Sequence, residues 1–156
     1  MRVCNEDRGK TLVNSTNKAR AALEDLKVHV RFKLSALWAA VMFCYIYGDY
    51  FSLFESGRLK GMMAGEPSAF GMANQGVLVG VALLMAIPSV MIFLSLALRP
   101  VLNRWLNLIF GSIFTVIMLA TMPGAWPFYM VLGVVEMVLT VLIVGYAWRW
   151  PRQEVA

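Results

Sequence analysis

Long runs of apolar residues, each interrupted by at most one charged side chain, dominate the chain from residue 34 onward. A helix needs about 20 mostly apolar residues to cross the hydrocarbon core of a bilayer. Helices of soluble proteins carry a polar face, and these runs have almost none. The pattern therefore predicts four membrane-spanning helices, over residues 34–54, 75–98, 105–122 and 127–148.

The connections between these runs favour an all-α fold, an antiparallel bundle of four transmembrane helices. The third and fourth runs are separated mainly by the short turn Pro123-Gly124-Ala125, so their helices must be antiparallel neighbours. The loop over residues 55–74 is rich in glycine but also carries apolar side chains. We expect this loop to fold back over the bundle or to dip into the membrane interface.

Composition and charge agree with a membrane protein. Hydrophobic residues make up 60% of the chain and charged residues 15%, whereas a soluble domain is about 45–50% apolar and about 25% charged. The net charge of +5 does not indicate a nucleic-acid partner, because the basic residues flank the apolar runs. Of the 14 Lys and Arg residues, all but Arg58 and Lys60 lie before the first run, between the second and third, or after the fourth. This bias predicts that both termini, including the tail over 152–156, are cytoplasmic.

The polar N-terminal segment, residues 1–33, is predicted to contain a cytoplasmic amphipathic helix over residues 15–33. Apolar side chains recur there at helical spacing, and Ser15 or Thr16 suits the N-cap. The basic residues of the segment favour contact with anionic lipid headgroups. The alternative is a solvated lead-in to the first membrane span.

Residues typical of metal or catalytic sites are scarce. Cys4 lies in a polar segment and Cys44 in an apolar run, which argues against a disulfide, and His29 has no partners at metal-ligand spacing. No Walker motif, dinucleotide fingerprint, nucleophile elbow or HExxH sequence occurs. We therefore expect no metal, no cofactor and no catalytic residue. An enzyme acting on a lipid or a quinone is the least favoured function class.

Two carboxylates inside apolar runs are the first candidates for a functional site. Ionisable side chains at such depth are costly and usually face the bundle interior or a water-filled cavity. From the helical rise, Glu136 lies roughly 13–14 Å below Pro127, near the bilayer midplane. Asp49 lies roughly 7–8 Å below Phe54. Tyr45 is one turn from Asp49 on the same face, and level with Glu136.

The other helices also place polar or kink-forming residues near this depth. Pro88 has no backbone N–H and so frees the carbonyl of Leu84. We predict that Glu136 and the Pro88 kink form the floor of a polar cavity that opens outward, with Asp49 and Tyr45 nearer its mouth. The residues of the third and fourth helices at this level are Ser112, Thr115, Gly133 and Thr140.

This polar layer has two interpretations. With no Lys or Arg predicted at its depth, Glu136 is expected to be neutral, or to ionise only when a cation or proton donor arrives. Alternatively the layer is structural, because polar side chains hold membrane helices together by about 1 kcal/mol each. The structural interpretation suits the Ser and Thr hydroxyls. The functional one suits the two carboxylates, and Tyr45 fits either.

Five stretches of the sequence together resemble a known family: KLSALW at 33–38, YIYGDYFSL at 45–53, AIPSVMIFLS at 86–95, NRWLNLIFG at 103–111 and VEMVLTVLIVGYAWRWP at 135–151. The pattern resembles a family of small bacterial four-helix membrane proteins of unknown function, broadly akin to DoxX-like proteins. It includes the intramembrane residues Asp49, Pro88, Asn103, Arg104 and Glu136. The resemblance implies a four-helix fold in the bacterial inner membrane, and it supplies no activity.

Two hypotheses on function follow. In the first, the protein binds or transports a small ligand, cation or proton at Glu136. In the second, it is a non-catalytic, DoxX-like interaction subunit that self-associates or supports a redox or envelope complex. The motif Gly76-x-x-x-Gly80 permits close helix contact, either within one subunit or in a homo-oligomer. The expected partners are the lipid bilayer, an unidentified small ligand and further copies of the chain, and not nucleic acid.

Overall fold

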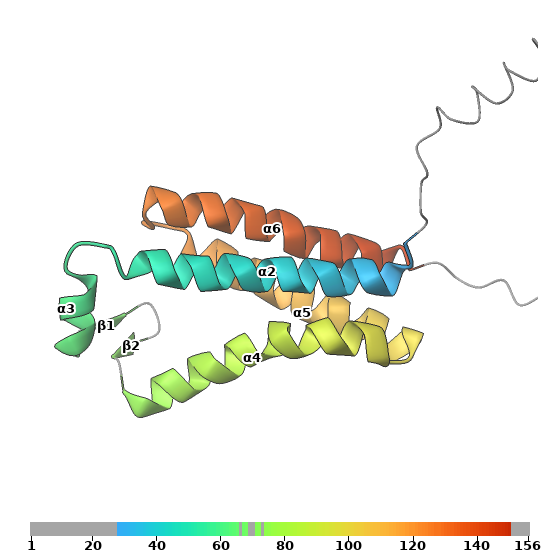
Figure 1. Cartoon of the computed structure of the whole chain (residues 1–156), viewed down its shortest axis with the longest axis horizontal. Coiled ribbons are helices and arrows are strands. Elements are labelled where there is room, and N and C mark those ends of the chain that lie inside the picture. The colour runs from blue at the N-terminus through green and yellow to red at the C-terminus, as the bar shows by residue number, and fades with distance from the viewer. Residues whose placement is uncertain (1–27, 66, 69–70, 73, 151–156) are drawn as a thin grey trace, which may run out of the picture.

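The computed structural model describes residues 28–65, 67–68, 71–72 and 74–150. Four long helices run antiparallel in a bundle (Figure 1). By length and composition each of them is able to cross a membrane, which confirms the four predicted apolar helices. Their bounds are α2 (Val30–Ser52), α4 (Gln75–Ala97), α5 (Pro100–Thr121) and α6 (Pro127–Trp148).

Two helices begin earlier than the apolar runs predicted. α2 begins at Val30, because Nδ1 of His29 accepts a hydrogen bond from the backbone N–H of Arg31 at 3.3 Å and caps the helix. α5 begins at Pro100, whose missing N–H costs nothing in a first helical turn. Hydropathy overlooks these first turns because they carry polar residues such as Arg31 and Asn103.

The predicted amphipathic helix over 15–33, with its caps Ser15 and Thr16, lies mostly outside the described residues. Residues 28 and 29 are not helical, and His29 has extended backbone angles, with φ −60° and ψ 142°. The chain from Val30 to residue 33 already belongs to α2. The prediction of a helix continuous to residue 33 is therefore wrong at its C-terminal end, because the extended His29 separates whatever precedes it from the first span.

The turn between α5 and α6 makes these helices the antiparallel neighbours that the sequence predicted. The N–H of Ala125 donates to the carbonyl of Met122 at 3.1 Å. Pro123 and Gly124 occupy the two central positions of the turn, and Gly124 has φ +80°. A proline followed by a residue with positive φ is typical of a type II turn, which favours glycine at that second position.

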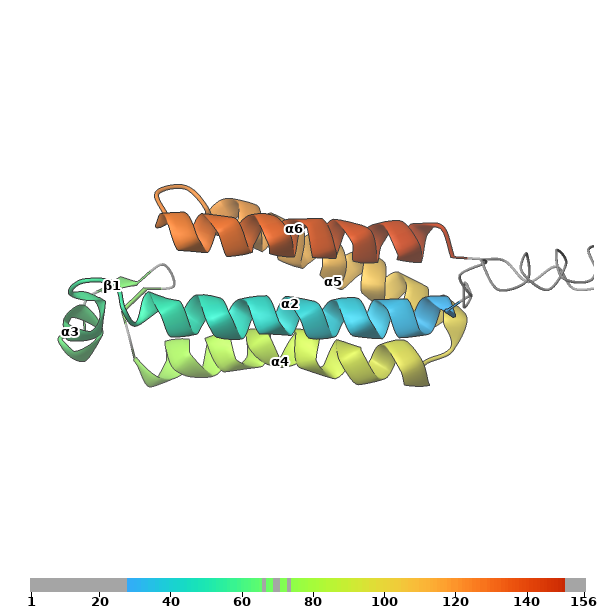
Figure 2. The ribbon, with the colours of Figure 1, turned by 45° about the horizontal axis from the view of Figure 1, so that its top comes forward.

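The helices pack in an order that the sequence did not predict. α2 packs against α4 on one side and against α6 on the other, and α6 also packs against α5. α4 and α5 touch only sparingly. Figures 1 and 2 show that α4 and α5 meet at the end of the bundle where α2 begins and α6 ends, and diverge toward α3. The bundle is therefore closed on three sides and loosely joined on the fourth.

The apolar core lies mainly in the half of the bundle where α2 begins. Its residues are at most 1% exposed, and they come from all four long helices. The cluster comprises Leu34, Trp38, Val41, Met91, Phe114 and Ile143. This half of the bundle is closely packed.

A chain of buried hydrogen bonds crosses the same half, and we call it the asparagine ladder. Trp38 Nε1 donates to Asn107 Oδ1 at 2.7 Å, and Asn107 Nδ2 donates to Asn103 Oδ1 at 2.6 Å. Asn103 Nδ2 in turn donates to the carbonyl of Ser95 at 2.6 Å. All four residues are fully buried. The ladder thus ties α2, α5 and the end of α4 together through amide groups that have no access to water.

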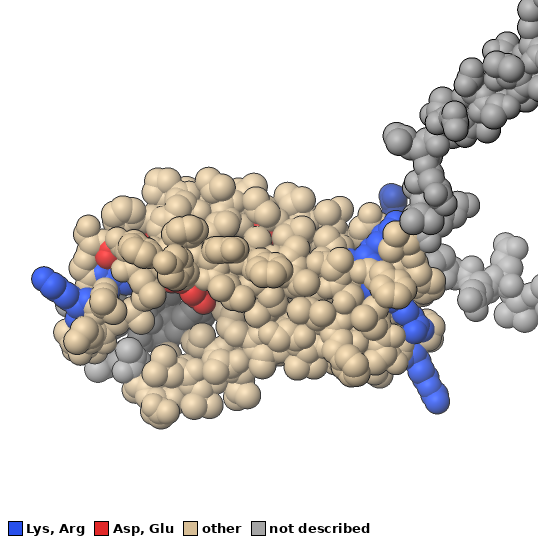
Figure 3. Space-filling model, in the orientation of Figure 1, with Lys and Arg blue, Asp and Glu red and all other residues tan. Residues whose placement is uncertain are grey.

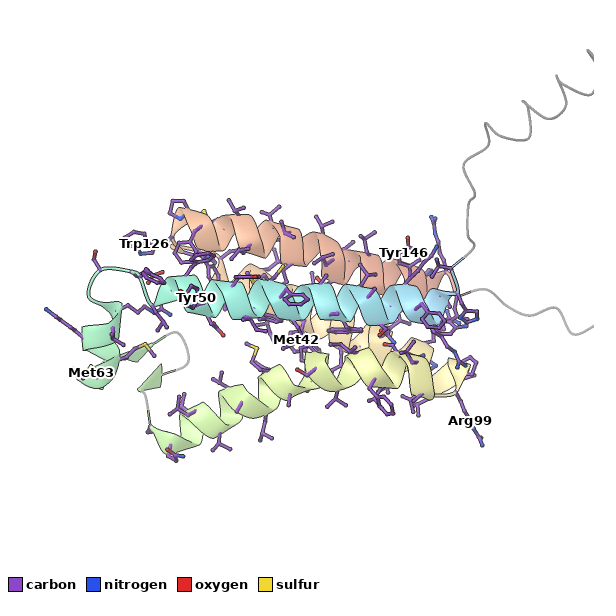
Figure 4. The ribbon with its side chains drawn as sticks, in the orientation of Figure 1. Met42, Tyr50, Met63, Arg99, Trp126 and Tyr146 are labelled. Carbon is purple, nitrogen blue, oxygen red and sulfur yellow. The ribbon has the colours of Figure 1, made fainter. Side chains whose placement is uncertain are left out.

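Charged and aromatic side chains mark the two ends of the bundle. Figure 3 shows that Lys and Arg gather at the ends, while the flank between them is almost free of charge. In the described residues, one end carries Arg58 and Lys60, and the other carries Arg31, Lys33, Arg99, Arg104 and Arg149. Tyr50 and Trp126 lie near the α3 end and Tyr146 near the opposite end (Figure 4). Charged and aromatic side chains at both ends are typical of helices that end at membrane interfaces.

The loop between α2 and α4 contains a short helix and a small hairpin. α3 (Arg58–Met63) is followed by the antiparallel strands β1 (Pro67–Ser68) and β2 (Gly71–Met72). These elements lie at the end of the bundle, beside the gap between α2 and α4 (Figure 1). The expectation that the loop folds back over the bundle or dips into the membrane interface stays a prediction. The hairpin also adds two very short strands to a fold predicted as all-α.

Candidate functional site

A cavity of about 60 Å³ lies inside the bundle, on the α3 side of the apolar core. All four long helices contribute to its wall, as expected of a ligand site between the helices of a bundle. A water molecule needs roughly 10–15 Å³ of such space, so the cavity has room for a small ligand or a few waters. Its lining consists of Cys44, Tyr45, Gly48, Asp49, Leu84, Met85, Phe114, Ile117, Met118, Thr121, Tyr129, Leu132 and Glu136.

Glu136 on α6 and Tyr45 on α2 both line this cavity and are its most distinctive polar residues. Glu136 is only 2% exposed, and its Oε1 has no hydrogen-bond partner among the described residues. The buried hydroxyl of Tyr45 is likewise unpaired within the described part of the chain. An unsatisfied buried polar group costs about 1–3 kcal/mol. The two groups also lie close enough to interact with each other, although no hydrogen bond of good geometry joins them. A bound molecule that bridges them would supply the partner that both lack.

The remaining polar residues lie toward the α3 end of the cavity. Asp49 is one turn from Tyr45 on α2 and is exposed, in keeping with a position near the mouth. The hydroxyl of Tyr129 donates to Thr121 Oγ1 at 3.3 Å, which links the start of α6 to the end of α5. Among the lining residues there is no Lys or Arg. Arg58, the nearest basic residue along α2 and its loop, is paired with Glu55 at 2.9 Å.

Several predicted site residues do not line the cavity. Ser112 is exposed on the outside of the bundle, because it follows the buried Gly111 by one residue and is rotated away by about 100°. Thr115 Oγ1 lies 2.8 Å from both Gly111 O and Thr140 Oγ1, so this pair of threonines joins α5 to α6. Pro88 is buried in the packing and does not line the cavity, although Leu84, whose carbonyl it frees, does.

The cavity is also less polar than predicted. Most of its lining residues are apolar. Of the predicted floor, Glu136 lines the cavity and Pro88 does not, whereas Tyr45 and Asp49, predicted nearer the mouth, both line it. Some predicted residues do not line the cavity because the sequence predicts their depth along a helix and not the side that they face. That side depends on how the helices pack. Gly133, Glu136 and Thr140 do share one buried face of α6.

The three glycines proposed for helix packing behave differently. A Cβ atom at Gly133 would lie 2.5 Å from Met118 Cε, so this glycine allows α6 to approach α5 closely. A Cβ atom at Gly80 would meet nothing within 4 Å, and one at Gly76 would meet only the neighbouring Asn74 side chain. In the described chain, the Gly76-x-x-x-Gly80 motif therefore makes no close contact with another helix.

Sequence reasoning missed two groups of polar residues. Thr121 and Tyr129 flank the short turn between the third and fourth runs, and that proximity was a usable signal for their contact. Asn103 and Asn107 are four residues apart on either side of the start of the third predicted span, which places two amides on one helical face. That spacing predicts a buried hydrogen-bond network, and the asparagine ladder is the result.

The closely packed half of the bundle closes the cavity on one side. Between the cavity and the end that carries Arg31, the side chains of Trp38, Val41 and Ile143 are completely buried and in one cluster. Buried side chains from all four long helices fill the described part of the bundle on that side of the cavity. The cavity is thus one-sided, and its polar approach lies toward Asp49 and the α3 end.

Comparisons with known proteins place the chain in a family without assigning it an activity. A family of unknown function, DUF6326, matches residues 24–156, which include all four long helices. No curated protein and no solved structure matches the chain. These findings support an uncharacterised family, and they contain nothing that links it to DoxX-like proteins. The chain belongs to the family of unknown function DUF6326.

Proposed function

We propose that this membrane protein binds a small molecule that carries a positive charge or a hydrogen-bond donor, with Glu136 as its principal contact. The observation that carries the proposal is the unpaired, 2% exposed carboxyl group of Glu136 in the wall of a cavity. A carboxyl group at the depth of the bilayer midplane is costly, and such residues commonly mark a substrate or ion pathway.

The chemistry of the lining favours a cation over an anion. Two carboxylates, Glu136 and Asp49, face the cavity, and the described lining offers no basic side chain to an anion. The rings of Tyr45, Phe114 and Tyr129 also belong to the wall. Aromatic faces attract an ammonium group, by about 2 kcal/mol or more where water is excluded. A small ammonium ion fits this combination of carboxylate and aromatic side chains.

The one-sided cavity supports binding more directly than transport. Movement of a ligand or proton across the membrane would require the cluster around Trp38 and Ile143 to open. The proposed orientation places that closed end at the cytoplasm, because it carries most of the described basic residues. The cavity then opens toward the outer half of the bacterial inner membrane. A DoxX-like role in a larger complex is compatible with such a binding site.

The proposal is tested by equilibrium binding of radiolabelled n-propylammonium to the purified protein in micelles. Saturable binding is expected for the unmodified protein, and Glu136→Gln should weaken it at least tenfold. Glu55→Gln serves as the matched control, because that carboxylate lies outside the cavity and is paired with Arg58. Equal binding by the Glu136→Gln and unmodified proteins, at the same monodispersity on gel filtration, would refute the proposal.

A further inference from the structure

The seam between α4 and α5 is the weakest side of the bundle, and it borders the cavity. Leu84 and Met85 of α4 and Ile117 of α5 line the cavity together. The two helices nevertheless pack only sparingly against each other. Both ribbon views show them diverging toward the α3 end (Figures 1 and 2). The cavity that holds Glu136 is thus separated from the lipid on this side by helices that scarcely touch.

The contacts of α4 with α2 show which side of α4 faces away from α2. Ser89 Oγ lies 3.4 Å from Met42 Sδ, and the carbonyl of Ile92 accepts from Ser35 Oγ at 2.9 Å, so this side of α4 faces α2. Figure 4 shows Met42 between the two helices. The residues Gly76, Gly80 and Leu84, spaced by four, lie about 150° around the helix from that side.

The two glycines leave this stripe of α4 without side chains. A Cβ atom at Gly80 would meet nothing within 4 Å. Gly80 and Gly76 lie one and two turns from Leu84, which places them roughly 6 and 12 Å along the helix toward the α3 end. A strip of α4 with little side-chain bulk therefore leads from Leu84 in the cavity wall toward the α3 end.

We propose that the ligand of Glu136 is a lipophilic amine that enters from the bilayer through the α4–α5 seam. Its ammonium group lies at Glu136 and its alkyl chain lies along Leu84 and Gly80. The inference rests on the proposed function, and it adds the class of ligand and the route of entry. The unpaired carboxyl group of Glu136 would bind the ammonium group, and the stripe of Gly76 and Gly80 leaves room for the alkyl chain. The closely packed half of the bundle, at the proposed cytoplasmic end, excludes entry from that side.

The proposal predicts how affinity depends on the length of the alkyl chain. Relative to the free amine in water, each added methylene that lies in the seam is removed from water and should tighten binding roughly fourfold. If the ligand were confined to a cavity of about 60 Å³, longer chains would fail to fit and affinity would fall. The two arrangements therefore predict trends of opposite sign.

The test measures binding of n-propyl-, n-hexyl- and n-nonylammonium to the full-length protein in one micelle type. The Glu136→Gln variant provides the correction for partition of each amine into the micelle. Affinity should rise along the series for the unmodified protein. Gly80→Leu should weaken n-nonylammonium at least tenfold and leave n-propylammonium unchanged. Gly145→Leu is the matched control, because that glycine is also in open space but lies on α6, and it should change neither.

The outcomes separate this inference from the proposed function. If n-propylammonium binds through Glu136 but longer amines bind no better, or if Gly80→Leu affects every amine equally, the seam route is refuted and the proposed function stands. If no amine shows Glu136-dependent binding, the proposed function itself fails. A dimer that becomes a monomer on Gly80→Leu, measured by light scattering, would assign the stripe to a second copy of the chain and overturn the proposal.

Discussion

The asparagine ladder should hold the bundle together through coupled hydrogen bonds, and a double-mutant cycle between Trp38 and Asn107 tests this. Trp38→Phe removes the Nε1–H donor, so Asn107 Oδ1 loses its partner at 2.7 Å. Asn107→Leu leaves two fully buried groups, the Trp38 indole N–H and Asn103 Oδ1, without their partners.

The expected magnitudes follow from the burial of these groups. Each unsatisfied buried group costs about 1–3 kcal/mol, whereas hydrogen bonds between membrane helices average about 0.6 kcal/mol and reach about 1.7. Because the ladder residues have no exposed surface, we expect values toward the upper end of the membrane range. Trp38→Phe should cost about 1.5 kcal/mol of unfolding free energy and Asn107→Leu about 3 kcal/mol, the latter because two groups are left unpaired.

The double variant is the decisive measurement, because it removes both partners of the Trp38–Asn107 bond. It should be more stable than the sum of the single effects predicts, by about 1 kcal/mol. Reversible unfolding in mixed micelles, followed by far-ultraviolet circular dichroism, gives all four values. Trp148→Phe is the control, since that tryptophan is 69% exposed and should change stability little. Additivity of the two single effects to within about 0.3 kcal/mol would refute the coupling.

Four further substitutions test packing and polar contacts by the same unfolding assay. Gly111→Ala should cost about 1–3 kcal/mol, because its Cβ would lie 2.9 Å from Val144 Cγ2, a β-branched side chain with little freedom to move. Gly145→Ala has no neighbour within 4 Å and should cost nothing; equal losses would contradict the steric reasoning. Thr115→Val should cost less than about 1 kcal/mol, since Thr140 keeps its bond to Met137 O. Arg58→Ala breaks an ion pair in which the Arg58 side chain is 44% exposed and the Glu55 side chain only 10%. It should cost about 1–3 kcal/mol, because a largely buried carboxylate loses its partner, and an unchanged stability would contradict this.

Hydropathy was sufficient to locate the four long helices, because each must present apolar side chains along its whole length to lipid. The fourth span was predicted at its observed bounds, Pro127–Trp148. The starts of α2 and α5 were missed, since helix initiation depends on local geometry that hydropathy does not record. The cap formed by His29 and the position of Pro100 in a first turn are such local features.

The depth of each candidate site residue along its helix could be predicted from the sequence, but the side of the helix bundle that it faces could not. Counting residues along each helix placed Tyr45 and Glu136 at one level, and both line the cavity. The same counting included Ser112, which faces outward. Whether a residue faces in or out depends on which helices are neighbours, and nothing in the spacing showed that α2 packs between α4 and α6. The loose α4–α5 side arises from the same packing order.

The two halves of the bundle differ in how tightly their helices are joined, and this sets where a tilt of α4 would have its largest effect. The helices are joined at the end where Trp38 donates a hydrogen bond to Asn107 and links α2 to α5. The ends of α4 and α5 near α3 lie apart (Figure 1). Displacement in a lever grows with distance from its fulcrum, so a small tilt of α4 widens the far end most. Glu136, at mid-length, would stay almost in place while the opening beside it changes size.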